Sequence, residues 1–158
     1  MFDTILGLPV HALVVHAVVI LVPLSAAGVV AIAAVPRWRE RFGTLVLLVS
    51  TAALVTVPVA TRSGEKLEER IGAKGVVARQ IEDHQEIGEL VLWPTLAMWV
   101  LAIGLVLISR RGSSKGAVKA VAVLAALVAI VAAGVVVRAG HLGSTAVWSC
   151  TIGSDACK

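Results

Sequence analysis

The sequence predicts an all-α integral membrane protein, a four-helix transmembrane bundle with both termini on the extracytoplasmic side. Hydrophobic residues make up 58% of the 158 residues and charged residues only 15%, too little polar content to coat a water-soluble globule. The apolar residues form four long blocks, and most basic residues fall in short segments between them. The formal net charge of +4 therefore indicates membrane topology, and we expect no nucleic-acid partner.

The first apolar block runs from about residue 9 to residue 35 and exceeds the roughly 20 residues that cross a hydrocarbon core. Pro9 suits the first turn of a helix, where the missing N–H would be unpaired in any case, and Pro36 ends the block. The preceding segment carries no basic residue, and the apolar run is longer than that of a signal peptide. We therefore expect a retained first helix.

The second block covers about residues 45–60, and a polar stretch follows it. In the third predicted helix, about residues 76–108, apolar residues such as Val77 and Ile81 recur at helical spacing before the apolar block begins. We therefore expect this helix to start outside the bilayer. A kink is expected near Pro94, because proline removes a helical hydrogen bond.

The fourth block covers about residues 117–139 and repeats alanine at four-residue steps, at Ala125, Ala129 and Ala133. Helices in lipid lack a hydrophobic drive to associate, so a face of small residues that permits close backbone approach favours helix packing. The four blocks leave no room for a separate soluble domain. We therefore expect one transmembrane domain over residues 1–158, with a short outer C-terminal tail.

The distribution of charge predicts the orientation. The turns after the first and third helices hold seven basic residues and one acidic residue, whereas residues 62–89 hold five basic and seven acidic residues. An excess of Lys and Arg in short loops marks the cytoplasmic side, so both termini should lie outside. Cys150 and Cys157 would then face an oxidising compartment, where we expect a disulfide that closes a short loop. Two unpaired thiols are the alternative.

All four histidines fall on the predicted outer side, at His11, His16, His84 and His141. A polar ring inside a membrane must find a partner, so an intramembrane ionisable residue is a candidate functional site. His11 and His16 are five residues apart, about 140° around a helix, and do not share a face. Since His16 lies deeper, we expect it and His84 to be the first ligands, followed by His141 and His11.

Arg138 precedes His141 by three residues and shares its helix face. A guanidinium at this depth favours a carboxylate or an anionic ligand, and the nearest acids by topology are Glu82, Asp83 and Glu86. Arg138 would also suit a haem propionate.

Three chemistries fit the histidine cluster. Imidazoles from facing helices are axial ligands of haem b. Alternatively, three or four of the imidazoles of His11, His16, His84 and His141 would hold zinc or copper, with a carboxylate completing the shell. The histidines and acids could also form a proton or quinone-linked relay. The remaining alternative is that each histidine makes an interhelical hydrogen bond and nothing more.

No enzyme motif accompanies the histidines: the sequence has no Cys-x-x-Cys-His, His-Glu-x-x-His, Gly-x-Ser-x-Gly or phosphate-binding glycine loop. An enzyme is therefore not expected. A transporter is disfavoured, because four helices without a detectable inverted repeat do not build the usual transporter site. The sequence leaves open whether the chain forms a homo-oligomer.

The opening Leu8-Pro9-x-His11-x-x-x-x-His16 resembles the Leu-Pro-x-His-Pro-x-x-Val-His-x-Pro opening of a bacterial membrane family, domain of unknown function 2231. His84 in the third helix and Gly140-His141-Leu142-Gly143 after the fourth block, similar to the family's Thr-Gly-x-x-Gly-Gly ending, extend the resemblance over nearly the whole chain. The sequence departs from the family pattern at Ala12, Ala139 and Ser144. The first of these replaces a common proline, which favours a regular first helix.

The resemblance implies a four-helix protein of the bacterial cytoplasmic membrane and an association with redox proteins, but no established activity. We expect a small multi-pass protein whose outer histidine cluster binds haem b or a metal ion, in electron transfer or as a subunit of a larger respiratory or redox complex. The alternative is a non-catalytic accessory subunit whose histidines only join helices.

Overall fold

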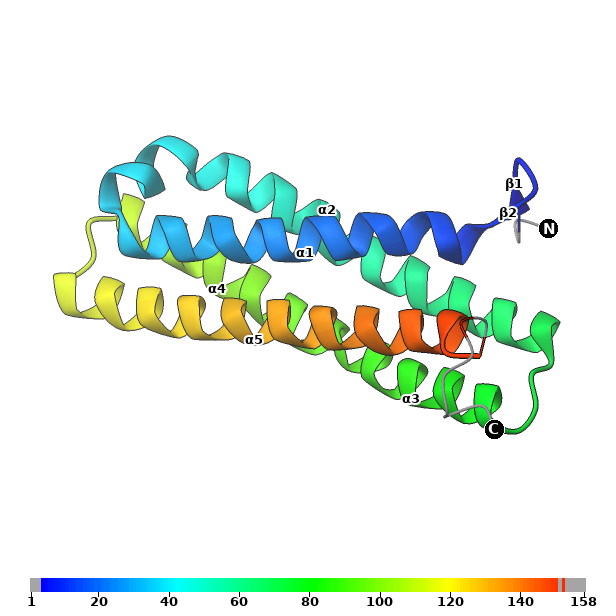
Figure 1. The fold of residues 1–158 in the computed structure, drawn as a ribbon. Coiled ribbons are helices and arrows are strands. Elements are labelled where there is room, and N and C mark those ends of the chain that lie inside the picture. The colour runs from blue at the N-terminus through cyan, green and yellow to red at the C-terminus, as the bar shows by residue number, and fades with distance from the viewer. Residues whose placement is uncertain (1–3, 151, 153–158) are drawn as a thin grey trace.

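The computed structural model describes residues 4–150 and residue 152, and most of them are helical. The elements run in the order β1 (Thr4–Ile5), β2 (Leu8–Pro9), α1 (Val10–Ala34), α2 (Pro36–Ile71), α3 (Val76–Leu90), α4 (Leu92–Arg110) and α5 (Lys115–Trp148). The two strands form a small antiparallel hairpin ahead of α1 that the sequence did not predict (Figure 1).

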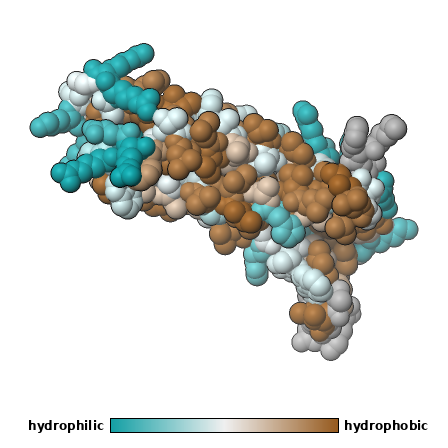
Figure 2. Space-filling model, turned by 90° about the horizontal axis from the view of Figure 1, so that it is seen from above, coloured by the Kyte–Doolittle hydropathy of each residue, from teal (hydrophilic) through white to brown (hydrophobic). Residues whose placement is uncertain are grey.

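Within the described residues, four segments are long and apolar enough to cross a membrane: α1, α2, the segment Val76–Arg110 that contains α3 and α4, and α5. The predicted four-helix membrane fold is thereby confirmed. Figure 2 shows a hydrophobic surface over much of the length of the molecule and a dense group of hydrophilic side chains at one end. The assignment of the termini to the outer side stays a prediction.

The helices form two hairpins. In the first, α1 packs along α2; in the second, α5 packs along both α3 and α4. The connections α1–α2 and α4–α5 lie at one end, which we call the basic end, and the α2–α3 connection lies at the opposite end with the β1–β2 hairpin and the end of α5 (Figure 1). α2 and α3 make few contacts with each other, so the hairpins are packed less tightly at the end opposite the basic end.

The core between the hairpins is built from small and branched side chains. Ala125, Ala129 and Ala132 on α5 are fully buried, whereas Ala133 is only partly buried. The buried alanines of α5 are therefore spaced alternately four and three residues apart, and not at strict four-residue steps. Such small residues let helix backbones approach closely in lipid, where burial of apolar area offers little drive for association.

Two helices extend beyond the predicted apolar blocks. α2 continues past Ala60 through a segment rich in Glu, Lys and Arg and ends at Ile71, and the next residue, Gly72, forms a left-handed C-cap with φ of 55° and ψ of 38°. α5 continues past Ala139 to Trp148. Glu, Lys and Arg have good helix propensity and carry α2 past its apolar block without a break.

The kink predicted at Pro94 is present as the boundary between α3 and α4. α3 ends at Leu90, four residues before Pro94. In a straight helix the carbonyl of Leu90 would have no N–H partner, because proline lacks one, and it would clash with the proline ring. The backbone N–H of Val91 instead bonds the carbonyl of Gly88 at 3.2 Å.

The basic end is closed by Arg39, which is 6% exposed. Its guanidinium donates to the carbonyl oxygens of Ile32 and Ala33 at 2.8 and 2.9 Å, and to Ser109 Oγ at 3.0 Å. The two carbonyls belong to the last turn of α1, where carbonyl groups lack helical partners and the helix dipole favours a cation. Arg39 therefore ties the end of α1 to α2 and α4.

Candidate histidine site

His11, in the first turn of α1, and His84, in α3, face each other at the end opposite the basic end. Their ring centroids lie 6.1 Å apart, and the ring planes make an angle of 74°. The two residues come from different hairpins and are separated by most of α1, all of α2 and the start of α3. The site is therefore formed only when the two hairpins come together.

Each ring is fixed by the same kind of hydrogen bond. Nδ1 of His11 lies 3.0 Å from the carbonyl oxygen of Ala60 on α2, and Nδ1 of His84 lies 2.9 Å from that of Ala139 on α5. A carbonyl oxygen only accepts, so Nδ1–H is the donor in both rings. In the neutral imidazole this leaves Nε2 with a lone pair, the form in which histidine binds a metal.

Each ring also lies against a glycine four residues beyond its carbonyl partner. A Cβ placed on Gly64 would come within 3.1 Å of Cε1 and Nδ1 of His11, and one placed on Gly143 would come within 2.9 Å of Cε1 of His84. Carbon atoms do not approach so closely without displacing one another. Glycine at these positions lets the imidazoles lie against the backbones of α2 and α5.

The two hairpins thus present matching units. In each one, the leading helix supplies a histidine, and the following helix supplies the Ala-x-x-x-Gly segment that holds it: Ala60 to Gly64 in one hairpin and Ala139 to Gly143 in the other. Both units lie at the same end of the bundle. This is a parallel correspondence between hairpins and differs from the inverted repeats of transporters.

A cavity of about 900 Å³ surrounds the histidine pair. Its walls come from α1, α2, α3 and α5 and are mainly apolar, with His11, His16 and His84 among the residues that line it. Ligand pockets usually have volumes of about 300–1,000 Å³ and apolar walls with a few polar groups. The size and lining of the cavity fit an apolar ligand of cofactor size.

Polar groups lie where α2 and α3 border the cavity. Gln85 Nε2 donates a hydrogen bond to Glu68 Oε2, and this contact joins the two helices. Glu65 and Glu89 also line the cavity and are exposed. The apolar chamber is therefore bordered by carboxylates on this side.

The structure separates the other predicted ligands from the facing pair. His16 lines the cavity, but it is exposed and its Nδ1 bonds the carbonyl of Ala12 on its own helix. His141 and Arg138 are exposed and do not line the cavity. Depth in the first apolar block favours His16 over His11, whereas the structure places His11 beside His84.

Among residues 4–150 and 152, no group of three or more His, Cys, Asp or Glu side chains is arranged to hold a metal ion. The predicted four-histidine set of His11, His16, His84 and His141 is thus not brought together. The predicted disulfide involves Cys157, which lies outside the described residues, so the pairing with Cys150 stays a prediction.

Comparison with known proteins gives one match. A family model described as "Predicted membrane protein (DUF2231)" matches residues 7–156, nearly the whole chain, and agrees with the resemblance found in the histidine and glycine motifs. No curated protein and no solved structure matches the chain.

Proposed function

The chain belongs to the DUF2231 family of predicted membrane proteins, and on this premise we propose that it binds haem b between its two hairpins, with His11 and His84 as the axial ligands. The facing histidine pair carries this proposal. Metal–imidazole bonds are about 2.0–2.1 Å long, so two rings on opposite sides of one ion have centroids about 6 Å apart. The observed separation is 6.1 Å.

The hydrogen bonds of the pair support the same assignment. A histidine that binds a metal through one nitrogen usually donates the other ring N–H to a carboxylate or a backbone carbonyl, which fixes its tautomer and orientation. Ala60 and Ala139 provide such carbonyls for His11 and His84. Both rings are therefore oriented before any ligand arrives.

Haem is favoured over a bare metal ion by the number of protein ligands. Structural zinc sites use four protein ligands and catalytic ones three, whereas this pair offers two imidazoles in a large apolar cavity. Haem brings four nitrogens of its own and needs only axial ligands and an apolar chamber. The zinc or copper alternative therefore has less support.

Two axial histidines would fill both open positions of the iron, which favours electron transfer over chemistry at the metal. The protein would then act as an electron carrier or as a subunit of a larger redox complex in the membrane. Pairing of Arg138 with a propionate stays a prediction, since this residue is exposed and does not line the cavity.

An accessory subunit without a cofactor is the second candidate. Each facing histidine already bonds a backbone carbonyl of a neighbouring helix, so both could serve only to join helices. Interhelical polar contacts of this kind contribute about 0.6–2 kcal/mol each in membranes.

An absorption spectrum tests the proposal. The full chain is purified in detergent, titrated with haem b and compared with His11→Ala, His84→Ala and the exposed control His141→Ala. We expect a one-to-one complex with a low-spin bis-imidazole spectrum in the wild type and the control. Both site variants should lose that spectrum while circular dichroism shows the helices retained. A wild type that takes up no haem, or site variants with an unchanged spectrum, would overturn the proposal and leave the accessory role.

A further inference from the structure

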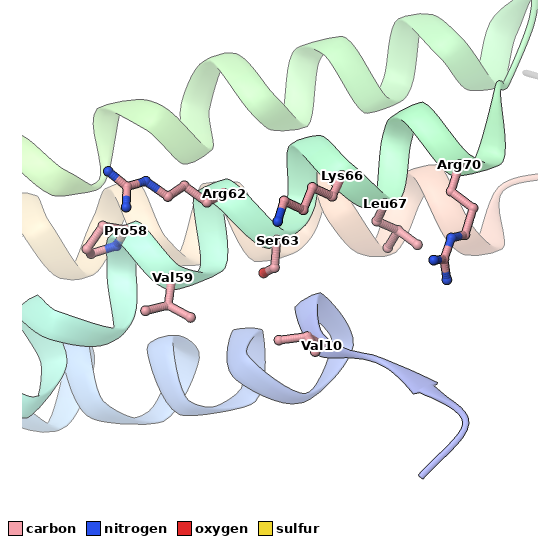
Figure 3. Close-up of a pocket in the computed structure, with 8 residues that line it drawn as sticks. All are labelled: Val10, Pro58, Val59, Arg62, Ser63, Lys66, Leu67 and Arg70. Atoms are coloured by element: carbon pink, nitrogen blue, oxygen red, sulfur yellow. The ribbon is translucent and has the colours of Figure 1, made fainter. Parts of the chain in front are cut away.

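A second pocket, of about 300 Å³, lies between α2 and the start of α1 (Figure 3). It adjoins the histidine cavity at Leu67, which lines both, and shares no other lining residue with it. Val10, at the start of α1, forms one wall, and the other lining residues all belong to α2: Pro58, Val59, Arg62, Ser63, Lys66, Leu67 and Arg70. In Figure 3 the basic residues follow one another along α2, with Pro58 and Val59 at the end of the row nearer the membrane block. The pocket therefore combines an apolar part with a row of cations.

Basic side chains line the pocket on α2, and the exposed Glu69 lies on the same helix face as Arg62 outside the lining. The pocket is lined by three basic residues and no acidic residue, whereas Glu65 and Glu68 line the histidine cavity. Within the described residues, neither Arg62 nor Lys66 has an ion pair or a hydrogen bond from its side chain to the protein. Arg62 and Lys66 are therefore available to an anionic ligand in the pocket.

The height of these cations above the apolar block matches a lipid headgroup. The apolar block of α2 ends at Ala60, so a rise of 1.5 Å per residue places Arg62 about 3 Å and Lys66 about 9 Å beyond it. The polar layer on each side of a bilayer is about 5–8 Å thick. Arg62 lies within that layer, and the flexible stem of Lys66 lets its ammonium bend back into it.

We propose that this pocket binds an anionic phospholipid, with Arg62 and Lys66 contacting the headgroup phosphate and an acyl chain lying against Val10, Pro58 and Val59. Basic pockets beside membrane helices select anionic headgroups because the phosphate and any further anionic group meet fixed cations near the surface. The site is separate from the histidine pair and does not depend on haem binding.

Lipid binding by the full chain in detergent tests the proposal. Native mass spectrometry measures retention of phosphatidylglycerol against phosphatidylcholine for the wild type, for Arg62→Gln/Lys66→Gln, and for Lys74→Gln/Arg79→Gln. The last variant loses the same charge near the same end but outside the pocket. A cation near the membrane surface changes anionic-lipid binding about fivefold. We therefore expect the preference for phosphatidylglycerol over phosphatidylcholine to fall about 5- to 30-fold in the Arg62→Gln/Lys66→Gln variant and to be retained in the control.

Three outcomes would overturn the proposal. The first is equal retention of the two lipids by the wild type. The second is an equal loss in both double variants, which would indicate a response to net charge alone. The third is displacement of phosphatidylglycerol by inorganic phosphate at the same concentration, which would indicate a simple anion site. Circular dichroism of each variant checks that the helices are intact.

Discussion

At the residue scale, the histidine site depends on the absence of a side chain at two positions. Gly64 and Gly143 allow the imidazoles of His11 and His84 to lie against helix backbones, while the carbonyl one turn earlier on each helix holds Nδ1. A side chain at either glycine would push the ring away from the carbonyl that orients it. The glycines are therefore positioning residues for both imidazoles.

We predict that Gly143→Ala weakens haem binding by at least tenfold and destabilises the protein by about 1–3 kcal/mol, the usual cost of overpacking. The new Cβ would meet His84 Cε1 at 2.9 Å and displace the ring. Gly134→Ala on the same helix is the control, because a Cβ there meets nothing within 4 Å. It should stabilise α5 by about 0.5–1 kcal/mol.

Titration with haem and denaturant unfolding in detergent measure both effects of this glycine substitution. Equal haem affinity in the Gly143→Ala and Gly134→Ala variants would show that close approach of the ring to α5 is not required.

The sequence indicated the histidines but not which of them would meet. His16 was preferred over His11 because it lies deeper in the first apolar block. The structure places the pair where α2 and α5 extend past their apolar blocks, so Gly64 and Gly143 fell outside the predicted helices. Recognition of the two Ala-x-x-x-Gly segments as helical, one in each hairpin, could have identified the partners of His11 and His84.

At the element scale, the break between α3 and α4 determines where His84 lies. α3 ends at Leu90, one and a half turns beyond His84, and α4 continues in the membrane from Leu92. A straight helix through this region would carry His84 along the axis of α4, away from its present position beside α5. The proline-induced kink could be predicted from the sequence, whereas the direction of α3 after it depends on packing against α5.

We predict that Pro94→Ala weakens haem binding about tenfold without lowering the melting temperature. Alanine restores the N–H that can bond the carbonyl of Leu90, and proline inside a helix costs about 3 kcal/mol, so the straight form becomes more favourable. Pro36→Ala is the control, since Pro36 lies in the first turn of α2 at the basic end. Haem titration and thermal unfolding provide the two measurements. A variant that binds haem as tightly as the wild type would show that packing on α5 alone holds α3.

At the scale of the whole molecule, the two hairpins are held together at one end and border a half-open cavity toward the other. Arg39 and the buried alanines of α5 secure the basic end and the middle of the bundle. Toward the other end, α2 and α3 make few contacts, and the facing histidines bridge the hairpins. A cofactor bound there would complete the contact between the hairpins.

The orientation of the bundle is the last prediction. The α1–α2 and α4–α5 turns, which hold the basic residues, lie together at one end, and the α2–α3 connection lies at the other (Figure 1). The histidine cavity is lined by the parts of α2 and α3 nearest that connection. Lys and Arg in short loops stay on the cytoplasmic side during insertion, so the cavity should open near the extracytoplasmic surface. Alkaline phosphatase fused after Lys158 should therefore be active, and green fluorescent protein fused there should be dark. Fusions in the turn at residues 111–114 should behave in the opposite way. Active phosphatase in that turn, with an inactive C-terminal fusion, would place the histidine site on the cytoplasmic side and require an electron partner there.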